Sequence, residues 1–185
     1  MAVKSTFKNM TLCLFCVCIV SSALLAGVYA LTKAPIAAAA QKKTNDAIAA
    51  VLPEFEGTPE EASVEVAGKN YSYYKVSKGG KVVGYAIKSS SVGFGGPVSL
   101  MVGVTAKGIV YNTSVLSQSE TPGLGAKCTD PSFAAQFKEF DPFKNKLSVT
   151  KDGGSIQAIT ASTITSRAYC AAVQTALDVF AEITK

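Results

Sequence analysis

The chain has 185 residues, of which 48% are hydrophobic and 17% charged, and this length predicts one domain with an appendage. It contains no histidine, which excludes Ser-His and Cys-His catalytic pairs, His-ligated zinc and His-ligated haem. The net charge of +5 falls to fifteen bases against thirteen acids without Lys4, Lys8 and Lys33, and no basic stripe interleaved with aromatic residues supports nucleic-acid binding.

A nearly continuous apolar run, MTLCLFCVCIVSSALLAGVYAL, lies between Lys8 and Lys33 without any charged residue. At about 1.5 Å rise per residue, a helix of this length spans the roughly 30 Å hydrocarbon core of a membrane. We therefore predict a cytoplasmic N-terminus over residues 1–9 and a transmembrane anchor over residues 10–32. A cleaved signal peptide is the alternative, since VYA ending at Ala30 suits a signal peptidase, but the run exceeds the ~7–15 residues of such a core.

The flanking charges predict the orientation of this anchor. Lys4 and Lys8 precede the apolar run and only Lys33 follows it closely, which favours a cytoplasmic N-terminus. We expect a single-pass protein of the cell (inner) membrane with everything after about residue 32 on the extracytoplasmic side.

Five cysteines fall into two groups. Cys13, Cys16 and Cys18 lie in the anchor, where they read as small apolar residues, with a metal or acylation site as the alternative. Cys128 and Cys170 lie in the outer domain, and the sequence does not decide whether they form a disulfide or stay as two free thiols.

Beyond the anchor, AAAAQKKTNDAIAAVLPEF predicts a helix that ends at Pro53, with Ile48, Val51 and Leu52 on its apolar side. GTPEEAS reads as a polar turn. NYSYYKVSK and KVVGYAIKS, joined by Gly79 and Gly80, predict a hairpin, and VSLMVGVTA and IVYNTSVLS predict two further strands.

The second half of the chain predicts a loop, SQSETPGLGAKCTD, and then a short helix that begins at Pro131. KLSVTKDGGSIQAIT predicts one or two strands, and the apolar spacing after Thr163 predicts a helix to about Ile183. Strands framed by helices without βαβ alternation predict an α+β fold of antiparallel strands flanked by helices. We expect a helical linker region at 33–70 and the main domain at 71–185.

Three stretches are candidates for a site. GFGG at residues 93–96 leads into a strand rather than a helix, so a turn is favoured over a phosphate-binding loop. In ETPGLG, Pro122 fixes φ while Gly123 and Gly125 permit the close approach of another surface. The Ser-x-x-Lys pairs, as at Ser148 and Lys151, are not counted among these three stretches, because they lack the companion motifs of acyl-enzymes.

The third stretch, TASTITSRAYC, carries five hydroxyls in seven positions at the start of the last helix. One hydroxyl suffices as an N-cap, worth about 1 kcal/mol. A helix N-terminus also offers free N–H donors and the positive end of the dipole to a phosphate. The surplus hydroxyls thus point to an anionic ligand such as a phosphate. One of these hydroxyls can also form an ester with that phosphate. The identity of the ligand stays open.

The order GYAI, GFGGP, VSLMVGV, ETPGLGAK and GGSIQAITASTITSRA resembles the FMN-binding domain family of the Rnf electron-transport complex, in its G subunit, and covers essentially the whole chain. The resemblance implies FMN held covalently through a phosphate ester to a threonine of an Asp-x-x-Ser/Thr-Gly-Ala-Thr motif, attached by a flavin transferase. By position Thr163 is the acceptor threonine. Gln157, Ala161 and Ser162 stand where the pattern has Asp, Gly and Ala.

The resemblance also implies the surroundings of the flavin and the role of the chain. The expected FMN-binding residues are Thr163, Thr160, Ser162, Thr165, Ser166, Glu120, Thr121, Gly123, Leu124, Gly125 and Lys127. The implied function is an electron relay in a membrane-bound, ion-translocating ferredoxin:NAD oxidoreductase, with the other proteins of the complex as partners and no stand-alone catalysis. The alternatives are the C subunit of the Na⁺-translocating NADH:quinone reductase and a non-redox extracytoplasmic binding module.

Overall fold

The computed structural model describes residues 6–185, which form two compact units, one ending at Lys42 and one covering Lys43–Lys185. Helix α1, Phe7–Val51, runs through both. The domain boundaries expected from the sequence at residues 33 and 71 stay predictions.

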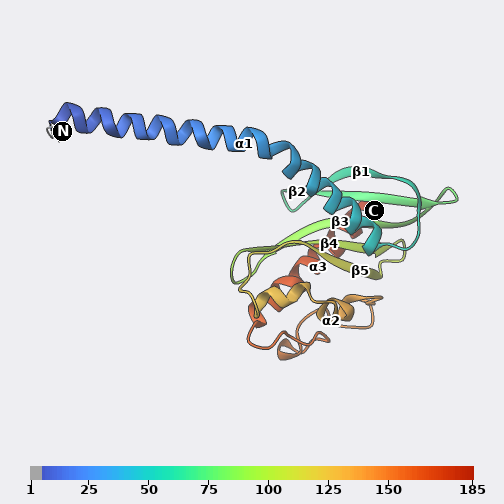
Figure 1. The fold of residues 1–185 in the computed structure, drawn as a ribbon. Coiled ribbons are helices and arrows are strands. Elements are labelled where there is room, and N and C mark those ends of the chain that lie inside the picture. Colours follow the sequence, from blue (N-terminus) through green and yellow to red (C-terminus); the bar gives the residue numbers. More distant parts are fainter. Residues whose placement is uncertain (1–5) are drawn as a thin grey trace. The chain divides into compact units, whose positions relative to one another are not determined.

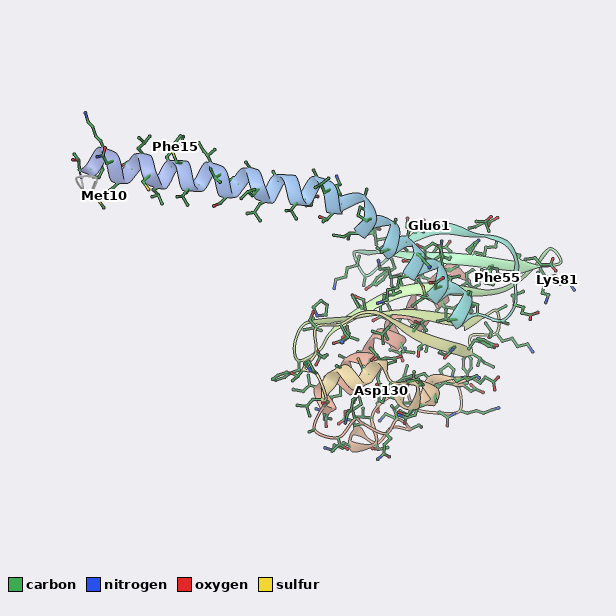
Figure 2. All side chains as sticks on the ribbon, in the orientation of Figure 1. Met10, Phe15, Phe55, Glu61, Lys81 and Asp130 are labelled. Atoms are coloured by element: carbon green, nitrogen blue, oxygen red, sulfur yellow. The ribbon has the colours of Figure 1, made fainter. Side chains whose placement is uncertain are left out.

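The part of α1 in the first unit is apolar on all sides. Figure 2 shows its side chains, among them Met10 and Phe15, projecting all around the helix. Phe15 is 61% exposed, and an 18-residue window of α1 has a mean hydropathy of 2.4 with none of it buried. A helix that is hydrophobic all round and uncovered by protein is suited to lipid, so α1 is long and apolar enough to cross a membrane.

The second unit is built on a five-stranded antiparallel sheet in the order β1-β2-β3-β4-β5 (Figure 1). The strands are β1 Glu56–Val66, β2 Lys69–Lys78, β3 Lys81–Val92, β4 Pro97–Thr105 and β5 Val110–Ser117. Four of them follow the predicted segments, and Gly79 and Gly80 form the predicted two-residue turn with φ of 58° and 77°. The predicted α+β fold is confirmed.

Strand β1 lies where the composition of GTPEEAS predicted a polar turn, so that prediction is wrong. β1 is an edge strand, and its outward positions carry charges such as Glu60 and Glu61, while Val64 and Val66 pack on the core. Charged residues on an edge strand protect it from pairing with other chains. They also interrupt the alternation of apolar residues by which a strand is predicted.

Both faces of the sheet are covered. Helix α3, Thr163–Ile183, packs on one face, where Val98, Leu100 and Val102 of β4 are fully buried. The last turns of α1 cover the other face through the predicted apolar side of that segment, with Ile48 against its core cluster. β4 is therefore buried from both sides, which explains its nearly continuous apolar sequence.

The connection between β5 and α3 is compact. It contains the 3-10 helix η1 (Gly125–Thr129), the predicted short helix α2 (Pro131–Ala134), and the 3-10 helices η2 (Ala135–Phe137) and η3 (Thr150–Asp152). The predicted strands at KLSVTKDGGSIQAIT are absent from this part of the described chain, where a single bridge pairs Val149 with Ile156. A Cβ at Gly154 would lie 2.0 Å from the carbonyl oxygen of Ser148, so the two glycines fold this segment into a tight loop.

Candidate functional site

A cleft of about 370 Å³ lies where three distant segments meet. They are the turn between β3 and β4, the ETPGLG loop after β5, and the start of α3. Its lining residues are Phe94, Glu120, Thr121, Leu124, Gly125, Ala161, Ser162, Thr163, Ile164 and Thr165. Its volume lies within the roughly 300–1,000 Å³ that small-molecule sites occupy.

Glu120 joins the three segments at the base of the cleft. Its side chain is buried, Oε1 accepts a hydrogen bond from the N–H of Gly95 at 3.0 Å, and Oε2 accepts one from Oγ1 of Thr165 at 2.7 Å. Its own N–H donates to Oε1 of Gln118 at 2.6 Å. Hydrogen bonds to a carboxylate are among the stronger ones in proteins, so Glu120 fixes the three walls to one another.

Two glycines make room for this carboxylate, and a third makes room for the neighbouring carbonyl oxygen of Ser119. A Cβ would lie 2.2 Å from Oε1 of Glu120 at Gly93 and 2.5 Å from Oε2 at Gly125. At Gly95 it would lie 2.2 Å from the carbonyl oxygen of Ser119. Gly93, Gly95 and Gly125 are thus required by close packing at Ser119 and Glu120. The predicted turn at GFGG is confirmed, with Gly93 donating its N–H to the carbonyl of Gly96 at 2.8 Å.

The hydroxyls at the start of α3 have different environments. Ser166 is fully buried, accepts from the N–H of Ile159 at 2.9 Å and donates to the carbonyl of Ser162 at 3.0 Å. Thr165 is 1% exposed and bonded to Glu120. Thr163 is only half-buried and lines the cleft. It is therefore the most accessible of the threonine and serine side chains that line the cleft from α3.

A lysine contacts the Thr163 hydroxyl. Nζ of Lys151 donates to Oγ1 of Thr163 at 3.3 Å. Lys151 lies on η3, and the next residue, Asp152, accepts two hydrogen bonds from Arg167 of α3, at 2.8 and 2.7 Å. The hydrogen bonds from Arg167 lower the pKa of Asp152. This exposed bidentate pair holds η3, and with it the lysine, beside the first turn of α3.

The backbone before α3 is strained. Ala161 has φ of 61°, in the left-handed region that costs a residue with a Cβ roughly 1–2 kcal/mol. Ser162, the N-cap residue, makes no side-chain cap hydrogen bond within the described chain, so its hydroxyl leaves the first-turn N–H groups of α3 uncapped. The site therefore combines free backbone donors, hydroxyls and one cation, which suits a phosphate.

Apolar side chains surround the mouth of the cleft. Phe94 is 72% exposed, Ile164 51% and Leu124 43%, and each comes from a different wall. Large apolar groups this exposed around a polar base are typical of a binding site for an amphipathic ligand.

The structure does not bring every predicted site residue into this cleft. Thr160 and Lys127 line a separate hollow, together with Gln136 and Gln157. Gly123, with φ of 77°, has open space where its Cβ would be, and Ser166 lies buried behind the cleft. The other predicted residues, which are Thr163, Ser162, Thr165, Glu120, Thr121, Leu124 and Gly125, line it.

Four neighbours of the site, Phe94, Ile164, Ala161 and Lys151, were not predicted from the sequence. Only Phe94 carried a signal, as a large apolar residue inside a glycine turn. Lys151 is twelve residues from Thr163 on another element, and no local pattern indicates their contact.

Cys128 and Cys170 are both buried free thiols. Burial raises the pKa of Cys128 to about 11 and that of Cys170 to about 12, with the charge of Glu120 adding to the effect on Cys128. They are neutral core residues at ordinary pH.

Comparisons with known proteins agree with this geometry. A family model described as the FMN-binding domain matches residues 93–178, which include all three walls of the cleft, and one described as the RnfG N-terminal region matches residues 1–51. A crystal structure of the C subunit of the Na⁺-translocating NADH-quinone reductase from Parabacteroides distasonis shares the fold, with a TM-score of 0.52 and 20% identity over 77% of this chain and 80% of that one. The match to the family model thus places residues 93–178 in the FMN-binding domain class, and the solved structure shows the same fold.

Two curated relatives define the family further. The chain is 36% identical over 175 residues to the G subunit of the proton-translocating ferredoxin:NAD⁺ oxidoreductase complex of Clostridium ljungdahlii, covering 92% of this chain and 88% of that one. It is 34% identical over 164 residues to the G subunit of the ion-translocating oxidoreductase complex of Methanosarcina acetivorans, covering 86% of each. The chain belongs to the family of G subunits of the ion-translocating oxidoreductase (Rnf) complexes. The resemblance drawn from the sequence is confirmed.

Proposed function

We propose that this protein is the electron-relay subunit of a membrane-bound, ion-translocating ferredoxin:NAD oxidoreductase, and that it carries FMN as a phosphate ester on Thr163. Family membership supports the relay. The observation that carries the attachment site is the half-buried Thr163 hydroxyl in the cleft, beside the Lys151 ammonium and the N-terminus of α3.

The residues of the cleft fit both ends of FMN. The phosphate end is suited to the start of α3, where Lys151 and the uncapped first turn supply positive charge and donors. The apolar side chains Phe94, Leu124 and Ile164 at the mouth are suited to an aromatic ring system. When bound, FMN supplies the redox chemistry, and the protein supplies position and electrostatics.

Each residue then has a role of its own. Lys151 neutralises the charge that a phosphate diester keeps next to Thr163, and Arg167 with Asp152 holds Lys151 in place. Glu120 holds the walls together, and Phe94 and Leu124 limit the access of water to the cleft. No general acid or base is required of this chain.

Attachment is a phosphoryl-type transfer. The oxygen of the Thr163 hydroxyl forms a bond to the flavin phosphorus of a dinucleotide donor, and the anhydride bond of that donor breaks. The nucleoside monophosphate leaves with the electron pair, and the hydroxyl proton passes to the transferase or to solvent. The product is FMN joined to threonine, so the protein gains the mass of FMN less one water while the rest of the donor leaves as the nucleoside monophosphate. A separate flavin transferase is the partner for this maturation step.

The anchor and the charge pattern support a location for this relay. The apolar part of α1 holds the protein in the cell membrane in a single pass, and the flanking lysines favour a cytoplasmic N-terminus with the FMN domain outside. A covalent link retains the flavin on that side, where a free nucleotide would be lost by diffusion. The other proteins of the complex are the redox partners.

The full chain, co-expressed with a flavin transferase, tests the proposal by intact mass and by in-gel flavin fluorescence after denaturation. We expect a mass gain of one FMN less one water, and its loss in Thr163→Ala. Ser155→Ala is the control, because it removes an exposed hydroxyl of the same segment outside the cleft. A wild-type protein without an adduct, or an adduct that survives Thr163→Ala in full, would refute the attachment site.

A further inference from the structure

The start of α3 presents two threonines to the same cleft, and only one of them is proposed as the attachment site. Thr163 and Thr165 both line the cleft and are two residues apart. A threonine hydroxyl has the same intrinsic reactivity at both positions. Something in the fold must therefore distinguish them.

The two hydroxyls differ in their hydrogen-bond partners. Oγ1 of Thr165 donates its proton to Oε2 of Glu120 at 2.7 Å, and the side chain is 1% exposed. Oγ1 of Thr163 accepts from Lys151 at 3.3 Å, so its own proton is not engaged in that contact. A hydroxyl that attacks phosphorus must reach the donor, and burial together with the short bond to Glu120 holds the Thr165 hydroxyl inside the protein.

Glu120 is itself held firmly. Oε1 accepts from the N–H of Gly95, and Gly93 and Gly125 leave just enough space for the carboxylate. It comes from a segment 45 residues before Thr165, so this contact is a product of the tertiary fold. The carboxylate therefore cannot turn away from Thr165 without breaking a second hydrogen bond and disturbing the β3–β4 turn.

We propose, on the basis of the function proposed above, that Glu120 is the residue that determines the attachment site, because it withdraws the Thr165 hydroxyl and leaves Thr163 as the acceptor. Glu120 acts through Thr165 and does not itself touch the reacting atoms. It is a positioning residue.

The test compares variants of the full chain co-expressed with a flavin transferase. Trypsin cuts after Lys151 and Arg167 and releases residues 152–167, which contain both threonines, so tandem mass spectrometry locates the adduct. Thr163→Ala is the parent, in which we expect no adduct. Adding Glu120→Ala removes the acceptor of the Thr165 proton and opens space beside it. We expect an adduct on Thr165 that is absent from the parent.

Two further variants separate this role from a merely structural one. Thr163→Ala with Thr113→Val removes another buried hydrogen bond, between Thr113 and Tyr169 at 2.8 Å, without touching Thr165, and we expect no adduct. Thr163→Ala with Glu120→Gln keeps the shape of the side chain. Its single amide oxygen cannot accept from both Gly95 and Thr165, as the two carboxylate oxygens of Glu120 do. This variant decides the question if Glu120→Ala does not fold, and we expect an adduct on Thr165 there too.

The outcomes are distinct. An adduct on Thr165 in the Glu120 variants alone supports the proposal. Folded Glu120 variants without an adduct, or an equal adduct in the Thr113→Val control, overturn it while the function proposed above stands. A wild-type protein without an adduct on Thr163 overturns both.

Discussion

Replacing Ala161 by glycine is expected to stabilise the protein. Ala161 has φ of 61°, which costs an L-residue with a Cβ roughly 1–2 kcal/mol relative to its ordinary conformations. Glycine removes that strain but gains about 0.4–1 kcal/mol of conformational entropy in the unfolded chain. The difference leaves a net stabilisation of about 0.5–1 kcal/mol. For a domain of this size we expect the midpoint of thermal unfolding to rise by roughly 1–4 °C.

In a matched control, the same Ala→Gly substitution is expected to lower the stability of the protein. Ala135 is exposed and has φ of −57° and ψ of −25°, an ordinary helical conformation. Ala135→Gly relieves no strain, so we expect it to destabilise the protein by about 0.5–1 kcal/mol. Ala67→Gly, with φ of 50° in the β1–β2 turn, repeats the stabilising case far from the cleft.

Near-ultraviolet circular dichroism of the full chain in detergent is a suitable assay. The chain has no tryptophan, and six of its seven tyrosines lie after residue 43, so the tyrosine signal reports the unfolding of that unit. If Ala161→Gly lowers the midpoint as Ala135→Gly does, the left-handed conformation before α3 is refuted.

Three other predictions concern the core and the charge of the site. Gly103→Ala places a Cβ 1.7 Å from the carbonyl oxygen of Val51, so we expect a loss of stability of about 1–3 kcal/mol or more, measured by thermal unfolding. Lys151→Ala removes the cation beside the acceptor hydroxyl and should lower the rate of FMN attachment about two- to fivefold, whereas Lys144→Ala, at an exposed surface pair, should not. The pKa of Cys128 is raised to about 11 in the folded protein, so its contribution to stability is fully present below the unfolded pKa near 9 and is lost as the pH rises toward 11. The midpoint of thermal unfolding should therefore fall when it is measured from pH 7 to 10.5. We expect this fall to be less steep in Cys128→Ala.

Much of the fold could be predicted because its elements have regular patterns. The alternation in β2 and β3, the glycine pair between them and the 3.6-residue spacing of α3 each follow from local sequence. β1 could not be predicted in this way, because charges on its exposed edge interrupt the pattern. The alternating apolar residues of the segment before α3 predict a strand, but Gly153 and Gly154 close this segment into a loop.

Part of the site could be predicted from the sequence for a similar reason. The hydroxyl run and the ETPGLG loop stand out as stretches with more special residues than a turn or a cap requires. Their partners do not, because contacts such as that between Glu120 and Thr165 join segments 45 residues apart. Phe94 and Lys151 likewise reach the site only through the pairing of β3 with β4 and the Arg167–Asp152 contact.

The most direct test of the central claim is to locate the flavin in the mature chain. Tandem mass spectrometry of the tryptic peptide covering residues 152–167, from protein co-expressed with a flavin transferase, distinguishes every hydroxyl of the run. We predict one FMN less one water on Thr163. An unmodified peptide, or an adduct located on any other residue, would contradict the account.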